Sequence, residues 1–330
     1  MPFVISFFSW TIKFIVLQYW GREWGLEMES LILSLNVVMP LLFLILVGQG
    51  VRRRHLCDER TLKQMNQWVF KLFLPCTLFN NILATDLKTV LQPQLLIYAA
   101  SGVLIACAAG WLIMPRISPD PRKQGVMIMN TYRSNAVLFG MPIVQLIYGD
   151  AQLGVMSMLI AVIVPLFNIL SVIVLESFRG GKARLSKLAE GIVTNPLILA
   201  SGLGLLCLFT GIHLWKPLAS VISDMGKVST PLALIILGAG FQAEKVAENK
   251  KELIASVSAR LVWTPLAALG TAVVLGIRGV ALVSLLAIFA SPNAVSSYSM
   301  AEGMGSDSEL ASQGLLFSTV FCIPTIFLWI

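Results

Sequence analysis

Ten long apolar stretches, separated by short connections, constrain this chain more than any other feature of its sequence. They lie near residues 31–51, 67–85, 94–114, 124–147, 153–176, 190–211, 217–241, 253–276, 280–301 and 308–330. A helix needs about 20 apolar residues to cross a bilayer core of roughly 30 Å. Only 12% of the residues are charged, about half of the roughly 25% that is typical of soluble domains. The sequence therefore predicts an all-α integral membrane protein with ten transmembrane helices.

The basic residues lie in short clusters between the apolar stretches and do not form one patch. The net charge of +7 is therefore a property of the connections and does not indicate a nucleic-acid-binding surface. If the connection after the first stretch is cytoplasmic, the inner connections hold most of the Lys and Arg residues, as the positive-inside rule requires. We expect a multi-pass protein of the inner (plasma) membrane, with both ends of the ten-helix unit outside.

Residues 1–27 precede the first clear transmembrane stretch. They are apolar and aromatic, but they have neither the early basic region nor the clear small-residue cleavage site of a signal peptide. We interpret them as an N-terminal extension, with an interfacial helix as one alternative, and assign them no function.

The sequence gives no sign of catalytic or metal chemistry. The five cysteines form no CxxC pair, so we interpret them as small buried hydrophobic residues. No GxxxxGK[ST], GxSxG or HExxH motif occurs, which argues against ATP-driven transport and against a membrane hydrolase. We expect no catalytic residues, no metal site and no cofactor.

The two halves of the chain resemble each other. Three matches recur at nearly the same spacing: Asn135-Ala136-Val137 with Asn293-Ala294-Val295, Asp150 with Asp307, and Pro75 with Pro231. We therefore predict a first repeat over residues 28–178 and a second over 179–330, with five helices each. Since five is odd, the second copy would be inverted relative to the first, as in many secondary transporters.

The fourth and ninth stretches are unusual because they combine helix-breaking and polar residues at membrane depth. Gly140 and Pro142 lie in the middle of the fourth stretch, and Pro292 lies at the centre of the ninth. We predict two broken helices that cross at the midplane, with Asn135 and Asn293 at the breaks. The N-terminal ends of the resumed halves carry partial positive charge and could hold a carboxylate. The alternative is a pair of Pro-kinked helices whose Asn side chains bond neighbouring backbone.

Arg133 lies two residues before Asn135. It could draw an anion toward the predicted crossover, or it could extend to a cytoplasmic cavity, and the sequence leaves both readings open. No carboxylate lies clearly within a stretch at the crossover. The choice between proton coupling, sodium coupling and uniport therefore also stays open.

These motifs resemble those of the auxin efflux carrier family. The resemblance rests on Asn135 with Gly140 and Pro142, on Pro292-Asn293 followed by Ser296-Ser297, and on the segments NVVMPLLFLILVGQGVRRR and LPCTLFNNI. It extends over residues 28–330 and implies ten helices in two inverted repeats, with substrate bound where helices 4 and 9 cross. The family includes plant auxin exporters and bacterial carriers associated with malonate or malate. Ser134 stands where plant members have a proline, and the long cytoplasmic loop of many plant members is absent.

We therefore expect a secondary transporter that moves a small organic anion by alternating access. The anion would be a dicarboxylate, such as malonate or malate, or an auxin-like acid. The candidate substrate-binding residues are Asn135, Asn293, Gly140, Pro142, Pro292, Ser296, Ser297 and Arg133. The alternatives are a ligand-binding membrane sensor and an anion channel without coupled transport. The expected partners are the organic anion, a coupled proton or sodium ion, the lipid bilayer and, as an option, a second copy in a homodimer.

Overall fold

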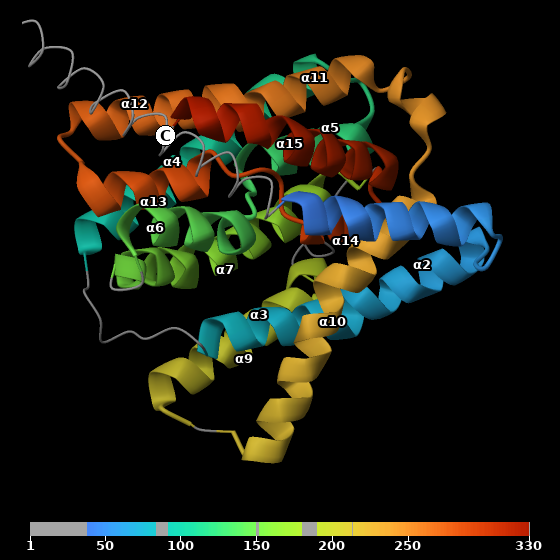
Figure 1. Ribbon diagram of the computed structural model, residues 1–330, viewed down its shortest axis with the longest axis horizontal. Coiled ribbons are helices and arrows are strands. Elements are labelled where there is room, and N and C mark those ends of the chain that lie inside the picture. Colours follow the sequence, from blue (N-terminus) through green and yellow to red (C-terminus); the bar gives the residue numbers. More distant parts are fainter. Residues whose placement is uncertain (1–37, 84–91, 150–151, 180–189, 213, 330) are drawn as a thin grey trace, which may run out of the picture.

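The computed structural model describes residues 38–83, 92–149, 152–179, 190–212 and 214–329. The predicted N-terminal extension, residues 1–27, lies outside these ranges. Within them the chain is helical and contains no β-strand, only one isolated bridge between two helix interruptions (Figure 1). The expected all-α fold is confirmed for this part of the chain.

The helices follow the apolar stretches in order. They are residues 38–53, α2 (Glu59–Trp68), η1 (Val69–Phe73), α3 (Leu74–Leu83), α4 (Pro93–Ile113), η2 (Met114–Arg116), α5 (Pro121–Tyr132), η3 (Ala136–Gly140), α6 (Met141–Tyr148), α7 (Leu153–Ser177), residues 190–193, α9 (Pro196–Thr210), α10 (Lys216–Gly240), η5 (Ala243–Val246), α11 (Lys250–Ser258), η6 (Ala259–Trp263), α12 (Thr264–Val274), α13 (Gly279–Phe289), α14 (Ser296–Gly303) and α15 (Ser308–Trp329).

Five continuous helical segments of the described chain are long and apolar enough to cross a membrane. They are Pro93–Arg116, Leu153–Ser177, Lys216–Gly240, Lys250–Val274 and Ser308–Trp329. Three further apolar helices are shorter: Ala136–Tyr148, Pro196–Thr210 and Gly279–Phe289. Two of these three are short because each is one half of an interrupted helix. The pattern is that of a multi-pass membrane protein, while the count of ten membrane crossings stays a prediction.

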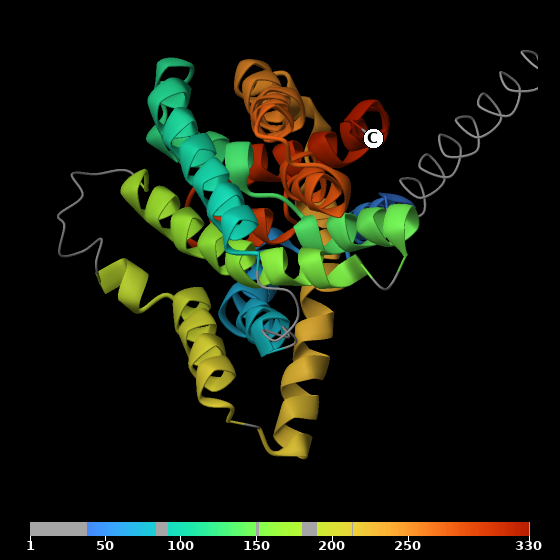
Figure 2. The ribbon, with the colours of Figure 1, turned by 90° about the vertical axis from the view of Figure 1, so that its left-hand side faces the viewer.

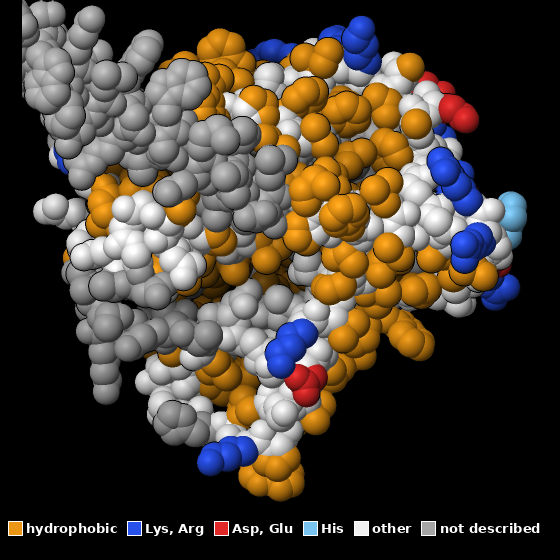
Figure 3. All heavy atoms as spheres, in the orientation of Figure 1, with side chains coloured by type: hydrophobic (Ala, Val, Ile, Leu, Met, Phe, Trp, Pro, Cys, Tyr) orange, Lys and Arg blue, Asp and Glu red, His pale blue; other side chains and the backbone are white. Residues whose placement is uncertain are grey.

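Large hydrophobic side chains cover the outer surface of the helices. On α4, Ile97 is 68% exposed and Ile105 is 67% exposed. Figure 3 shows a broad hydrophobic surface along the helices, with Lys and Arg side chains at the upper and right-hand edges and a few more in the lower part of the view. In water such a large apolar surface would promote aggregation, whereas the hydrocarbon tails of lipids can cover it without a cost in free energy.

The helices form two groups. Residues 38–53, the continuous helix α2–η1–α3, α9 and α10 pack against one another and make the first group. Helices α4 to α7 and α11 to α15 make the second, in which α5 packs on α4, α7, α11 and α15. Figures 1 and 2 show α3, α9 and the start of α10 below the second group, and α7 and α14 link the two groups through contacts with α3, α9, α2 and α10.

Two glycines bring helix 38–53 and α10 into backbone contact. A Cβ atom added to Gly48 would lie 2.1 Å from the carbonyl oxygen of Ile235, and one added to Gly238 would lie 2.0 Å from that of Ile45. Small residues of this kind allow close helix packing where lipid provides no hydrophobic driving force between helices.

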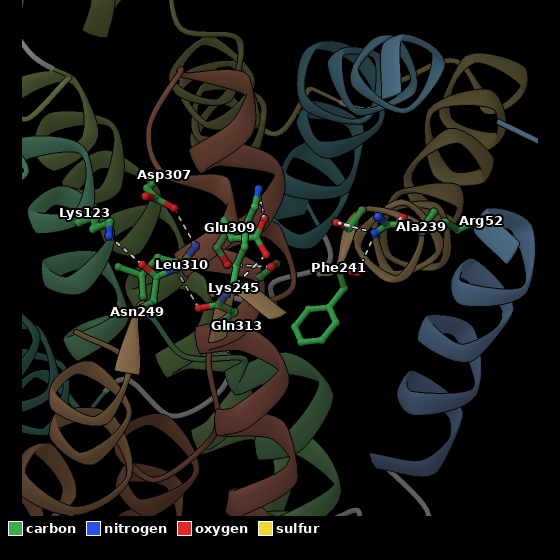
Figure 4. A network of polar contacts seen from close by, with 12 residues as sticks. Arg52, Lys123, Ala239, Phe241, Lys245, Asn249, Asp307, Glu309, Leu310 and Gln313 are labelled. Carbon is green, nitrogen blue, oxygen red and sulfur yellow. Dashed lines mark hydrogen bonds and ion pairs between the residues drawn. The ribbon is translucent and has the colours of Figure 1, made fainter. Parts of the chain in front are cut away.

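A chain of polar contacts joins the connections at one end of the molecule (Figure 4). Lys123 Nζ donates to Asn249 Oδ1 at 2.7 Å, and Asn249 Nδ2 donates to Gln313 Oε1 at 3.1 Å. Gln313 in turn donates to Glu309, which also lies 3.6 Å from Lys245 Nζ.

Arg52 lies at the same end, where its Nη1 donates to the carbonyl oxygen of Phe241 at 2.9 Å (Figure 4). The connections around Arg52, Lys123 and Lys245 are all among those that the charge pattern assigns to one side of the membrane. The structure thus gathers these basic connections at one end, and the assignment of that end to the cytoplasm stays a prediction.

Candidate functional site

Both helices that were predicted to be broken are interrupted. Helix α5 ends at Tyr132, residues 133–135 are not helical, and the chain resumes as η3 at Ala136. Helix α13 ends at Phe289, residues 290–295 are not helical, and the chain resumes as α14 at Ser296. Asn135 and Asn293 therefore both lie within interruptions, as expected.

The two interruptions pair with each other. Ser134 and Asn293 form an isolated antiparallel bridge, and the Asn135 backbone N–H donates to the carbonyl oxygen of Pro292 at 2.8 Å. Non-helical backbone inside a membrane protein must satisfy its polar groups within the protein. Each interruption supplies partners for the other, which explains why the two occur together.

Gly140 and Pro142, the helix-breaking residues of the fourth stretch, do not themselves interrupt it. The interruption ends before them, and both residues lie in a helix that continues from the π-helical turn η3 into α6. A π-helical turn shifts the backbone bonding by one residue, which accommodates a proline that cannot donate an N–H. Gly140 provides packing space, because a Cβ there would lie 2.4 Å from Met156 Cε.

A cavity of about 250 Å³ lies between the two groups of helices, beside the paired interruptions. Its polar lining residues are Thr77 and Asn81 on α3, Asn168 on α7, Ser229 and Thr230 on α10, Arg133, Ser134 and Asn135 in the first interruption, and Ser296 at the start of α14. The apolar part of the lining includes Leu74, Leu78, Val164, Phe167 and Ala233.

Three of the eight candidate residues line this cavity: Arg133, Asn135 and Ser296. Asn293, Pro292 and Ser297 are buried next to the paired backbone without lining it, and Gly140 and Pro142 lie further along their helix. The sequence analysis missed the contributions of α3, α7 and α10. The sequence does contain an indication of these contributions, because polar residues such as Asn168 and Ser229-Thr230 lie inside apolar stretches.

Among the described residues that line the cavity, Arg133 is the only one with a charged side chain. It is 3% exposed, and its guanidinium donates to Ser171 Oγ at 3.0 Å, to Asn168 Oδ1 at 2.7 Å and to Ser296 Oγ at 2.7 Å. All three acceptors are neutral, and its Nε–H has no acceptor among the described residues. A buried charge without a counter-ion is unfavourable, so this arrangement favours a negatively charged guest.

Residues at the N-terminal starts of both resumed helices also line the cavity. Residues 136–138, which open η3, line it, and so does Ser296, the first residue of α14. The first turn of a helix has N–H groups without helical partners and carries partial positive charge. The cavity therefore combines two helix N-termini with one guanidinium, and none of the described residues that line it carries a carboxylate.

Further polar groups of the lining have no partner within the described chain. The Asn135 side-chain nitrogen and the hydroxyls of Ser134 and Ser229 are buried without a hydrogen bond. Each can donate to an oxygen of a bound molecule. Both amide atoms of Asn293 are likewise without a partner in the ranges that the structure describes, but this side chain is 0% exposed.

Comparison with known proteins identifies a family for this chain. A family model described as a membrane transport protein matches residues 33–330, which is most of the chain and includes both interruptions and the cavity lining. No curated protein matches the sequence.

Proposed function

Because the chain belongs to this family of membrane transport proteins, the auxin efflux carrier family, we propose that it is a secondary carrier that moves a small organic anion by alternating access. Members of the family are transporters and not enzymes. The substrate would bind in the cavity beside the paired interruptions, with Arg133, Asn135 and Ser296 as its direct ligands.

The positive charge of the cavity is the observation that best supports an anionic substrate. Arg133 is buried among neutral acceptors, and the N-termini of η3 and α14 add partial positive charge next to it. A carboxylate would compensate this charge through short, charge-assisted hydrogen bonds. A neutral or cationic substrate would leave Arg133 without a counter-ion in a site of low dielectric constant.

The cavity volume favours a compact substrate. At about 250 Å³ it lies slightly below the roughly 300–1,000 Å³ that is common for drug-sized ligands. Malonate and malate are therefore the first candidates, and an auxin-like acid, with its larger ring system, is the second.

The position of the cavity supports alternating access. Its lining comes from α3 and α10 of one helix group and from α7 and the interruptions of the other, so a relative movement of the groups would open it to either side. In this proposal, residues 28–178 and 179–330 are inverted repeats, and helices 4 and 9 cross at the midplane. The remaining sequence-based assignments, inner-membrane location with outward ends, are part of the same proposal.

Uptake into liposomes tests this function directly. Purified protein in proteoliposomes is expected to accumulate radiolabelled malonate or malate above empty liposomes, with saturation, under an imposed proton, sodium or voltage gradient. Binding without flux under every gradient would favour a sensor, and flux that does not saturate would favour a channel.

The two interruption asparagines are expected to matter for transport and much less for folding. Asn135→Ala removes an amide donor from the cavity, and Asn293→Ala removes the side chain behind the paired backbone; each is expected to lower uptake about tenfold, the effect of losing roughly 1.4 kcal/mol. Initial rates in proteoliposomes measure this. Thr210→Ala on exposed α9, whose hydroxyl bonds only its own helix, is the matched control. Normal rates in both asparagine variants would remove these residues from the site.

A further inference from the structure

Arg260 is the most deeply buried basic side chain among the described residues, and it is not part of the cavity. It lies in η6 and is 0% exposed. Its Nη2 donates to the carbonyl oxygens of Ile288 and Phe289, both at 2.8 Å, and its Nε donates to that of Ser291 at 2.8 Å. One guanidinium thus binds the C-terminal end of α13.

The same guanidinium also binds the end of the other interrupted helix. Its Nη1 donates to the carbonyl oxygens of Tyr132 at 3.1 Å and Thr131 at 3.3 Å, which are the last two residues of α5. All five bonds of Arg260 go to backbone carbonyls, and none of these acceptors is a side chain. The guanidinium therefore joins the C-terminal ends of α5 and α13, at the points where the two interruptions begin.

These bonds complete the pairing of the end of α13. Its last four carbonyls would otherwise be without helical partners. Leu286 O accepts from the Ala290 N–H at 2.8 Å, and Ala287 O accepts from the Ser291 hydroxyl at 2.5 Å. The remaining two, those of Ile288 and Phe289, are bound by Arg260.

The C-terminal ends of two helices place partial negative charge at one point in the protein interior. In transporters with broken helices, such ends and the unwound carbonyls beside them coordinate the coupling cation. Here a positive charge attached to the chain already occupies that position. We propose that Arg260 is a tethered substitute for a coupling cation, which holds the two interruptions together so that transport needs no sodium ion at this point.

The two buried arginines would then have opposite roles at the same crossover. Arg133 contacts side-chain oxygens at the cavity, where the N-terminal helix starts attract an anion. Arg260 contacts only backbone oxygens at the opposite, C-terminal ends. It is a positioning residue, since it does not line the cavity and acts through the backbone of the interruptions.

The transport test, which rests on the proposed function, compares uptake in sodium with uptake in choline. Wild-type uptake is expected to be equal in both within about twofold. Arg260→Ala is expected to lose at least about tenfold and to regain part of the loss with millimolar guanidinium or sodium, and Arg260→Lys is expected to keep more activity than Arg260→Ala. Wild-type uptake that saturates with sodium, or Arg260→Ala uptake that equals wild type in choline, would overturn the proposal.

A second measurement needs no substrate and so separates this proposal from the carrier function. The thermal transition of detergent-solubilised Arg260→Ala is expected to rise with millimolar guanidinium, whereas that of wild type is not. Arg278→Ala is the matched control, because Arg278 is exposed and also donates to backbone carbonyls, those of Val273 and Ile277. An equal response of the two variants, or no response of Arg260→Ala, would overturn the proposal even if the protein transports anions. If Arg260→Ala does not fold, the same comparison is made with Arg260→Gln, which also removes the tethered charge. A rise of its thermal transition with millimolar guanidinium is expected, and the absence of such a rise counts against the proposal.

Discussion

Arg133→Met is expected to lower anion uptake about a hundredfold at low substrate concentration. Arg133 supplies the only full charge among the described residues that line the cavity. Losing one partner of a buried, hydrogen-bonded charge pair weakens binding by roughly 2–5 kcal/mol, and each 1.4 kcal/mol is a factor of ten. Initial uptake rates over a range of substrate concentrations measure the loss, which should include a higher KM. Arg133→Lys keeps the positive charge but loses the planar guanidinium that can donate two parallel hydrogen bonds. Its uptake rate should therefore lie between those of Arg133→Met and wild type.

The stability of the same variant separates binding from misfolding. In the substrate-free protein the Arg133 charge is buried against neutral acceptors only, and the desolvation cost of a buried charge without a counter-ion, which the substitution removes, offsets the loss of its hydrogen bonds. Arg133→Met is therefore expected to unfold in detergent at a temperature no lower than wild type. Stable protein with unchanged uptake kinetics would show that Arg133 does not bind the substrate. A large loss of stability would show instead that it has a structural role.

Gly48→Ala is expected to lower the free energy of unfolding by about 3 kcal/mol or more. The added Cβ would lie 2.1 Å from the Ile235 carbonyl oxygen and 2.8 Å from the Ala239 nitrogen. These are backbone atoms, which cannot turn aside as a flexible side chain can. Overpacking of an interior typically destabilises by 1–3 kcal/mol and occasionally by more. Thermal unfolding in detergent measures the change, and Gly238→Ala should behave similarly because its Cβ would meet Ile45 O at 2.0 Å.

Gly50 provides the control on the same helix. A Cβ added at Gly50 meets no atom within 4 Å, so Gly50→Ala should be neutral or stabilising by up to about 1 kcal/mol, because alanine favours the helix. If Gly48→Ala and Gly50→Ala unfold at the same temperature, helix 38–53 and α10 do not make the close contact described above.

The sequence located the two interruptions well, but for different reasons in the two helices. In the ninth stretch Pro292 lies within the interruption, as its chemistry suggests. In the fourth stretch the strongest local signal, Gly140 and Pro142, lies in continuous helix, and residues 133–135 are interrupted instead. The reason is tertiary: the extended backbone of residues 133–135 pairs with the segment around Asn293. Such pairing leaves no mark in the local sequence.

The sequence by itself determined that this chain is a helical membrane protein of the transporter family, with polar and helix-breaking residues in its fourth and ninth apolar stretches. It could do so because the transfer of apolar residues into lipid is nearly additive along the chain, so composition and spacing suffice. Only the tertiary structure decided what each buried arginine does. Arg133 and Arg260 both lie in apolar stretches, yet one faces a cavity among neutral side chains and the other binds the C-terminal carbonyls of two helices. The energy of a buried charge depends on the groups that surround it in space, and here those groups come from residues more than a hundred positions apart in the chain.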